Sequence, residues 1–211
     1  MLHQSPVLFS ALLGCVAGCY VPMDAQVPVA ALIDRRHFDP VASYASVAAR
    51  AGYEAQLVRI EARYVRDDGT VDSEAAYVNA WQPVVQYDFV KPIVPPNPRA
   101  RYTMLLLSLL APHVEWLPDW NGDAVRPTMV DGLYLRASGA TDEAPAGATT
   151  PPRCSFGALW ALAKGRGAPS NATATITYDA AGYDVSIDGT ALRLAVDHDC
   201  REVPAPVAAR G

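Results

Sequence analysis

The clearest pattern of apolar and polar positions lies in the last third of the chain. After Ser155, a residue type suited to capping a helix, apolar side chains recur at helical spacing. They are Phe156, Leu159, Trp160 and Ala163. Three segments then alternate apolar and polar positions, namely 172–178, 183–187 and 192–196, and Asp188-Gly189 predicts a hairpin turn between the last two. The pattern predicts a helix followed by a three-stranded antiparallel meander, with Trp160 buried between helix and sheet.

The same pattern assigns faces to the side chains of this meander, because successive residues of a strand point to opposite sides of the sheet. We expect one set to contact the helix: Tyr178, Tyr183 and Leu194. We expect the other set to face solvent or the rest of the chain: Thr175, Thr177 and Arg193.

The first half of the chain shows a similar but less regular order. Asp39 and Pro40 begin a predicted helix with an apolar face, which Gly52 ends. That face comprises Val41, Tyr44, Ala45 and Ala48. Residues 58–64 and 85–89 alternate as half-buried strands, the second ending at Pro92. Residues 102–110 are almost entirely apolar and predict a buried strand, with a buried helix as the alternative.

Residues 137–152 contain small residues and prolines and no large apolar side chain, so we expect them to lack regular structure. The predicted fold class is α+β, with two helix-plus-antiparallel-meander units, the second closed by a disulfide. The expected division of the chain is a leader over 1–18, an N-terminal unit over 19–136, a linker over 137–152, a C-terminal unit over 153–204 and a tail over 205–211.

Composition excludes two classes of protein. Of 211 residues, 51% are hydrophobic and 18% charged, which is incompatible with an intrinsically disordered chain. The formal net charge is −5, and the sequence has no basic run longer than two residues. Sequence-independent nucleic-acid binding is therefore not expected, because it requires a basic face to neutralise phosphates.

The first 23 residues carry no Asp, Glu, Lys or Arg, and residues 6–13 form a short apolar stretch. Residues 16–19 (Val-Ala-Gly-Cys) and, less closely, 12–15 (Leu-Leu-Gly-Cys) resemble the bacterial lipobox. This resemblance implies cleavage before Cys19 and acylation of that residue, with Cys15 as the competing position. An ordinary signal peptide or an uncleaved anchor helix over residues 6–23 is the alternative. The expected location is the cell envelope, with the protein held at a membrane by its lipid.

If Cys15 leaves with the leader and Cys19 is lipidated, Cys154 and Cys200 remain as an even pair in an oxidising compartment. We therefore predict a disulfide between them. The alternative is a reactive or metal-binding thiol pair, although neither cysteine has CxxC spacing and only His198 is near in sequence.

A helix followed by an antiparallel meander, repeated over 39–89 and 154–200, resembles the PepSY-like and cystatin-like modules of exported bacterial proteins. The residues that carry the resemblance best are Gly167-Ala168-Pro169, the threonine-rich strand after them and Tyr178. The resemblance implies a binding role rather than catalysis, and it brings no catalytic residue with it.

The sequence has no nucleophile elbow, phosphate loop, zinc-protease motif or dinucleotide fingerprint. No cofactor, catalytic residue or metal ligand is assigned. Residues 119–123 supply only the first three oxygens of a calcium loop, since Ala124 and Val130 occupy its required glycine and glutamate positions. Three tryptophans are candidates for a partner surface, with core packing as the alternative: Trp81, Trp116 and Trp120.

Two functions remain open at this stage. The first is a non-catalytic envelope lipoprotein that binds a protein or peptide through a strand edge or its aromatic loop. The second is a hydrolase or metal-dependent enzyme that uses His198 with Asp197 or Asp199, because a histidine and a carboxylate can form a general base or half a metal site.

Overall fold

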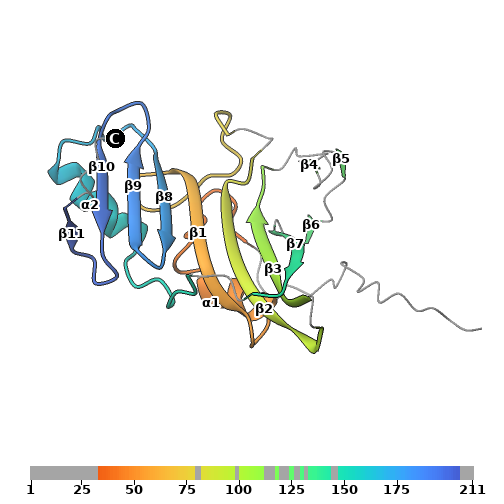
Figure 1. Cartoon of the computed structure of the whole chain (residues 1–211). Helices are drawn as coiled ribbons and strands as arrows, with labels where there is room; N and C mark the ends of the chain where they lie inside the picture. The colour runs from red at the N-terminus through yellow and green to blue at the C-terminus, as the bar shows by residue number, and fades with distance from the viewer. Residues whose placement is uncertain are drawn as a thin grey trace, which may run out of the picture.

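A computed structural model of the chain describes residues 33–78, 82–97, 100–111, 117–118, 124–125, 129–130, 133–143 and 147–204. Most described strands belong to one antiparallel sheet of nine strands, in the order β11-β10-β9-β8-β1-β2-β3-β7-β6 (Figure 1). The elements are α1 (Tyr44–Ala51), β1 (Gln56–Val65), β2 (Val85–Asn97), β3 (Ala100–Leu109), β4 (Leu117–Pro118), β5 (Ala124–Val125), β6 (Met129–Val130), β7 (Leu133–Thr141), α2 (Phe156–Gly165), β8 (Ala174–Asp179), β9 (Gly182–Ile187), β10 (Arg193–Val196) and β11 (Glu202–Val203). Strands β4 and β5 pair separately.

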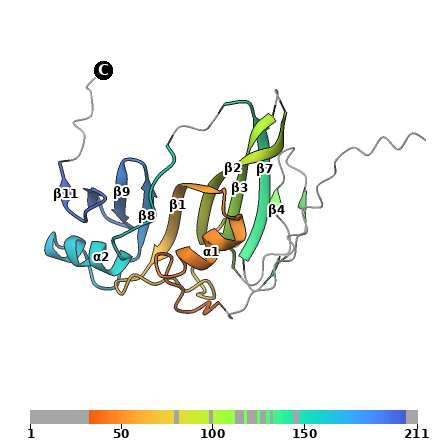
Figure 2. The ribbon, with the colours of Figure 1, turned by 90° about the horizontal axis from the view of Figure 1, so that it is seen from below.

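Both helices lie on the same face of the large sheet, as Figure 2 shows from the edge. The side chains that β1, β2, β8 and β9 present to this face form the core together with the helices. The largest of the fully buried side chains are Trp160, Tyr87, Tyr178, Phe89 and Phe156. The opposite face carries polar side chains, among them the ion-paired Arg59, Asp88 and Glu61. One apolar face and one polar face are what strand alternation predicts for an antiparallel sheet.

The predicted C-terminal helix and meander are confirmed. The Ser155 hydroxyl accepts a hydrogen bond from the Ala158 N–H, which caps the start of α2. Trp160 is fully buried, and β8, β9 and β10 pair in succession. A short strand, β11, extends this meander beyond the three predicted strands.

The two predicted units are not confirmed as separate meanders, because β8 pairs with β1 and joins all these strands in one sheet. In each half, a helix is followed by antiparallel strands. The strands that join the halves are the first after each helix, β1 and β8. Ile60 opposes Tyr178 and Ala62 opposes Ile176 across the junction, so the apolar faces of the two halves are continuous.

The first half differs from the prediction at two points and agrees with it at a third. The helix begins at Tyr44, because the Asp39 side chain accepts the N–H groups of Val41 and Ala42 in a preceding turn. Strand β2 continues past Pro92, which stands opposite Tyr102 of β3. The apolar segment near 102–110 is the strand β3, which settles the choice between strand and helix.

Strand β3 is buried over Leu107–Leu109 and only partly buried before that, so the expectation of a fully buried strand is half correct.

The expectation that residues 137–152 lack regular structure is wrong for 137–141, which form the end of β7. Small side chains did not prevent this, because β7 gains its backbone hydrogen bonds by pairing with β3 from Leu133↔Leu109 to Thr141↔Tyr102. Residues 147–152 contain neither helix nor strand. The Thr149 N–H nevertheless donates to the Leu57 carbonyl of β1, 2.7 Å away.

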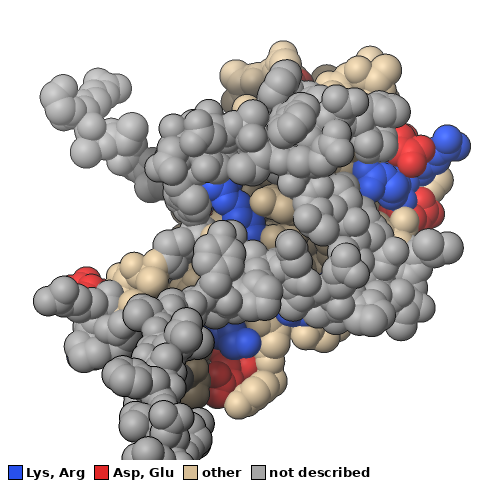
Figure 3. All heavy atoms as spheres, turned by 90° about the vertical axis from the view of Figure 1, so that its right-hand side faces the viewer, with Lys and Arg blue, Asp and Glu red and all other residues tan. Residues whose placement is uncertain are grey.

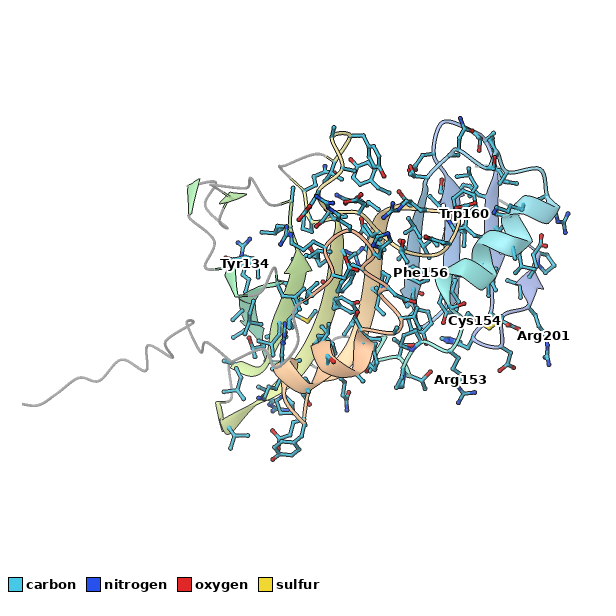
Figure 4. All side chains as sticks on the ribbon, turned by 180° about the vertical axis from the view of Figure 1, so that it is seen from behind. Tyr134, Arg153, Cys154, Phe156, Trp160 and Arg201 are labelled. Carbon is cyan, nitrogen blue, oxygen red and sulfur yellow. A yellow bond between two sulfur atoms is a disulfide. The ribbon has the colours of Figure 1, made fainter. Side chains whose placement is uncertain are left out.

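The predicted disulfide is present between Cys154 and Cys200, with their Cα atoms 5.6 Å apart. Cys154 directly precedes the N-cap of α2, and Cys200 lies in the turn between β10 and β11. The bond therefore links the start of the helix to the far edge of the meander. Each cysteine has an exposed arginine next to it in sequence, Arg153 and Arg201 (Figure 4).

Candidate functional site

His198 does not form the pair with a carboxylate that the alternative, enzymatic function requires. Its Nδ1 lies 3.0 Å from the Tyr178 hydroxyl, and its Nε2 lies 3.1 Å from the Ala180 carbonyl oxygen. A carbonyl oxygen only accepts hydrogen bonds, so Nε2 carries a proton in this arrangement. His198 thus ties the β10–β11 turn to the β8–β9 turn.

The two neighbouring carboxylates serve other contacts. Asp197 accepts the backbone N–H groups of Asp199 and Arg201, at 2.9 and 2.8 Å, and so closes the turn on itself. Asp199 lies 4.0 Å from Arg153 and 3.8 Å from Arg201. The structure therefore does not bring His198 together with Asp197 or Asp199.

The hydroxyl of Tyr178 is the centre of a polar cluster at this end of β8. It donates to the Thr150 carbonyl at 2.9 Å, and the Thr149 hydroxyl lies 3.3 Å away. The adjacent Tyr183 hydroxyl accepts the N–H of Cys154 at 3.1 Å, and burial raises the pKa of Tyr183. These bonds attach residues 149–154 to the meander. A cavity of about 340 Å³ borders the cluster and is lined by Ala148, Thr149, Thr150, Arg153, Ala180 and His198.

A larger cavity lies at the junction of the two halves. It measures about 790 Å³ and is called the bulge cleft here. Its lining residues are Arg63, Tyr64, Tyr77, Gln82, Asn171, Ala172, Thr173, Thr175, Asp188 and Gly189. They come from the end of β1, the loop after it, the segment that leads into β8 and the start of that strand, and the turn between β9 and β10.

An irregularity in β1 shapes the bulge cleft. The β1–β8 register shifts between Ala62 and Val65, so Arg63 and Tyr64 stand opposite one residue, Thr175. Tyr64 has φ +58°, a left-handed conformation that costs a residue with a side chain about 1–3 kcal/mol. Such a two-against-one bulge redirects side chains. Here both residues of the bulge, Arg63 and Tyr64, line the cleft.

The aromatic part of the cleft is formed by Tyr64 and Tyr77. Their ring centroids are 5.6 Å apart with an interplanar angle of 53°. Tyr77 is 53% exposed to solvent. The Tyr77 hydroxyl is a hydrogen-bond donor at neutral pH, as any tyrosine is, and partial burial raises its pKa further.

The polar part of the cleft is held in place by hydrogen bonds. Asp188 accepts the hydroxyl of Thr173 at 2.6 Å and that of Thr175 at 3.3 Å. Arg63 donates to Glu61 at 2.6 Å and to the Gln82 side-chain oxygen at 2.6 Å. Each charged group of the cleft is therefore positioned by a neighbour before any ligand arrives.

Sequence reasoning did not assign these residues to a site. It placed Thr175 on the outward face of its strand, which is correct, and treated Asp188 and Gly189 only as a hairpin turn. The Asp-Gly turn and the run of threonines were visible in the sequence, but the pairing of β1 with β8 that brings Arg63 and Tyr77 to them was not.

Several predicted site residues lie outside the described residues: Cys15, Cys19, Trp81, Trp116, Trp120, Asp119, Asn121 and Asp123. Within the described part of the chain, no three His, Cys, Asp or Glu side chains gather in a way that could hold a metal ion. No helix among the described residues has the length and apolar character needed to span a membrane.

Comparison of the chain with family models, curated proteins and solved structures finds no match.

Proposed function

We propose that this chain is a lipid-anchored cell-envelope protein that binds an extended peptide or a segment of a partner protein, without catalysing a reaction. The observation that carries the binding role is the outer edge of β7. Strand β6 pairs with β7 only through Met129↔Tyr134 and Val130↔Leu133. No described strand pairs with residues 137–141 on that side.

A strand edge of this length can accept an additional strand. The backbone N–H and C=O groups that point away from β3 can bond to an extended chain, and side chains on alternating positions then add selectivity. Figure 3 looks onto this end of the molecule, where described basic and acidic side chains occur next to each other.

The envelope location is supported by two features. The uncharged leader with Val-Ala-Gly-Cys at 16–19 matches the pattern of a lipid-modified precursor. The Cys154–Cys200 disulfide is the bond expected of a chain that folds in an oxidising compartment.

The binding role is tested by placing a photo-crosslinking amino acid at the exposed Ala140 of β7 in the full chain, expressed in bacterial cells. We expect illumination to give an adduct with a specific envelope protein. The same amino acid at Ala161, exposed on α2, is the matched control and should give none. Equal adducts at both positions, or none at Ala140, would contradict binding at the β7 edge.

The anchor is tested separately by mass spectrometry of the membrane fraction. We expect an N-terminal diacylated or triacylated Cys19, and we expect Cys19→Ser to abolish acylation and membrane retention. Recovery of the intact leader, or acylation at Cys15, would show that this assignment is wrong while leaving the β7 proposal to its own test.

A further inference from the structure

We propose that the bulge cleft is a binding site for a neutral saccharide. It lies at the junction of β1 with β8, away from the β7 edge, so this proposal is independent of peptide binding. Its volume of about 790 Å³ falls within the range of roughly 300–1,000 Å³ that is usual for small-ligand sites. Both halves of the chain contribute to it, and junctions between structural units are common places for such sites.

The tyrosine pair supplies the surface on which a sugar ring can stack. A pyranose presents one or both faces as patches of C–H groups, which pack against an aromatic ring while its hydroxyls point outward. Tyr77 is half exposed at the cleft, and Tyr64 lies against it at 5.6 Å between ring centroids. Each ring combines an apolar body with a polar hydroxyl, which suits a ligand that has both characters.

The polar side chains match a ligand whose hydroxyls both donate and accept. The carboxylate of Asp188 accepts, and the amides of Gln82 and Asn171 do both. The Arg63 guanidinium donates through Nε and Nη2 to Glu61 and through Nη1 to Gln82. Since it has five N–H donors, two have no partner among the described residues and remain for a ligand.

The balance of charge favours a neutral ligand over an ionic one. Among the described residues, the lining contains one cation, Arg63, and one anion, Asp188. Arg63 is already paired with Glu61, and Asp188 is already bonded to the hydroxyls of Thr173 and Thr175. A phosphate needs an unneutralised basic cluster and an ammonium group needs an unneutralised acidic one, and the lining offers neither.

The left-handed backbone of Tyr64 is consistent with a functional role. A tyrosine gains nothing intrinsic from φ +58°, and residues held in this region often lie at ligand sites. The bulge is the feature that brings both Arg63 and Tyr64 to the cleft, so its energetic cost is explained by the positions of these two side chains.

The test is isothermal titration calorimetry of the full chain, with its disulfide intact, against maltotriose, cellotriose, triacetylchitotriose and the charged trigalacturonate. We expect at least one neutral trisaccharide to bind with a Kd of about 1 mM or tighter. Tyr77→Ala should weaken that binding about tenfold or more, because it removes the exposed stacking ring. Tyr77→Trp should retain it.

Tyr53→Ala is the matched control, since Tyr53 is 95% exposed and lies outside the cleft, and it should leave the affinity unchanged. Asn171→Ala, at an exposed position of the cleft, gives a second measure if Tyr77→Ala lowers the melting temperature. Absence of binding by all three neutral trisaccharides, preference for trigalacturonate, or equal affinity in the two cleft variants and the parent would overturn the proposal.

Discussion

The indole N–H of Trp160 donates a hydrogen bond to the main-chain carbonyl of Val65, with 3.2 Å between nitrogen and oxygen. Trp160 lies in the middle of α2, and Val65 is the last residue of β1, directly after the bulge. Because both groups are buried, the bond fixes α2 of the C-terminal half to the first strand of the N-terminal half. The same contact therefore supports the junction at which the bulge cleft lies.

Loss of Trp160 should destabilise the whole sheet. We expect Trp160→Ala to lower the free energy of unfolding by about 3–5 kcal/mol, as for other buried aromatic truncations. Trp160→Phe should cost about 1–3 kcal/mol, because it removes the donor to the buried Val65 carbonyl. Urea denaturation measures both. Ala161→Lys, at an exposed position of the same helix, should change stability by less than about 0.5 kcal/mol. A Trp160→Ala variant as stable as this control would contradict the prediction.

Removal of the disulfide should lower stability without changing the fold. Cys154 and Cys200 are 46 positions apart, and the chain-entropy model gives at most about 4 kcal/mol for closing a loop of that length. We expect the double variant Cys154→Ser, Cys200→Ser to unfold at lower urea concentration. The parent protein in reducing agent should behave the same way. Free alkylation of both thiols in the folded, non-reduced protein would show that the bond does not form.

Local pattern was sufficient to predict the C-terminal half. Ser155 at the cap, the apolar spacing after it and the Asp188-Gly189 turn each act over a few residues, and α2, β8, β9 and β10 follow from them. The sequence has no comparable local pattern that predicts which distant strands pair. Strand β7 was missed because its residues after Ala137 are small, and only their pairing with β3 makes them a strand.

The candidate site was missed for the same reason. Arg63 and Asp188 are 125 positions apart in sequence, and the β1–β8 junction alone brings them to one cleft. The sequence offered His198 only for the alternative function, because two adjacent aspartates could form a general base or half a metal site with it. In the turn, the Asp197 carboxylate accepts backbone N–H groups instead. His198 therefore makes no contact with the aspartate next to it in sequence.

The backbone of Tyr64 predicts an inversion of the usual order of glycine and alanine. In a strand, glycine is less stable than alanine by about 0.5–1 kcal/mol. At φ +58° alanine carries a left-handed penalty of about 1–2 kcal/mol that glycine avoids. We therefore expect Tyr64→Gly to be at least as stable as Tyr64→Ala in thermal denaturation. The same pair at Thr177 of β8, which has no positive φ, should show the usual order. The usual order at both positions would contradict the left-handed conformation.

Stability should fall at alkaline pH because of Tyr87. Its fully buried hydroxyl donates to the Pro40 carbonyl at 2.6 Å, and burial raises the pKa of Tyr87 well above its ordinary value. The unfolded chain loses this proton above about pH 10 while the folded chain keeps it, so its contribution is complete below that pH and declines above it.

Tyr87→Phe should therefore show a shallower loss of stability than the parent when urea midpoints are compared between about pH 9 and 11. Phe89→Leu, a change in the same core that does not titrate, should lower stability and leave the slope unchanged. Parallel pH profiles for Tyr87→Phe and the parent would rule out Tyr87 as the cause.

Gly69 should be among the least replaceable residues of the chain, because it combines a left-handed backbone with a close contact. Its φ is +85°, and a Cβ there would lie 2.2 Å from the backbone nitrogen of Gly157 in α2. Gly189 has φ +73° with no atom within 4 Å of a Cβ, so it is a matched control for conformation alone. We expect Gly189→Ala to cost about 1–2 kcal/mol and Gly69→Ala to exceed about 3 kcal/mol, because the loop and helix must separate. Calorimetric melting of the two variants measures the difference, and equal shifts would show that the loop after β1 does not pack against α2.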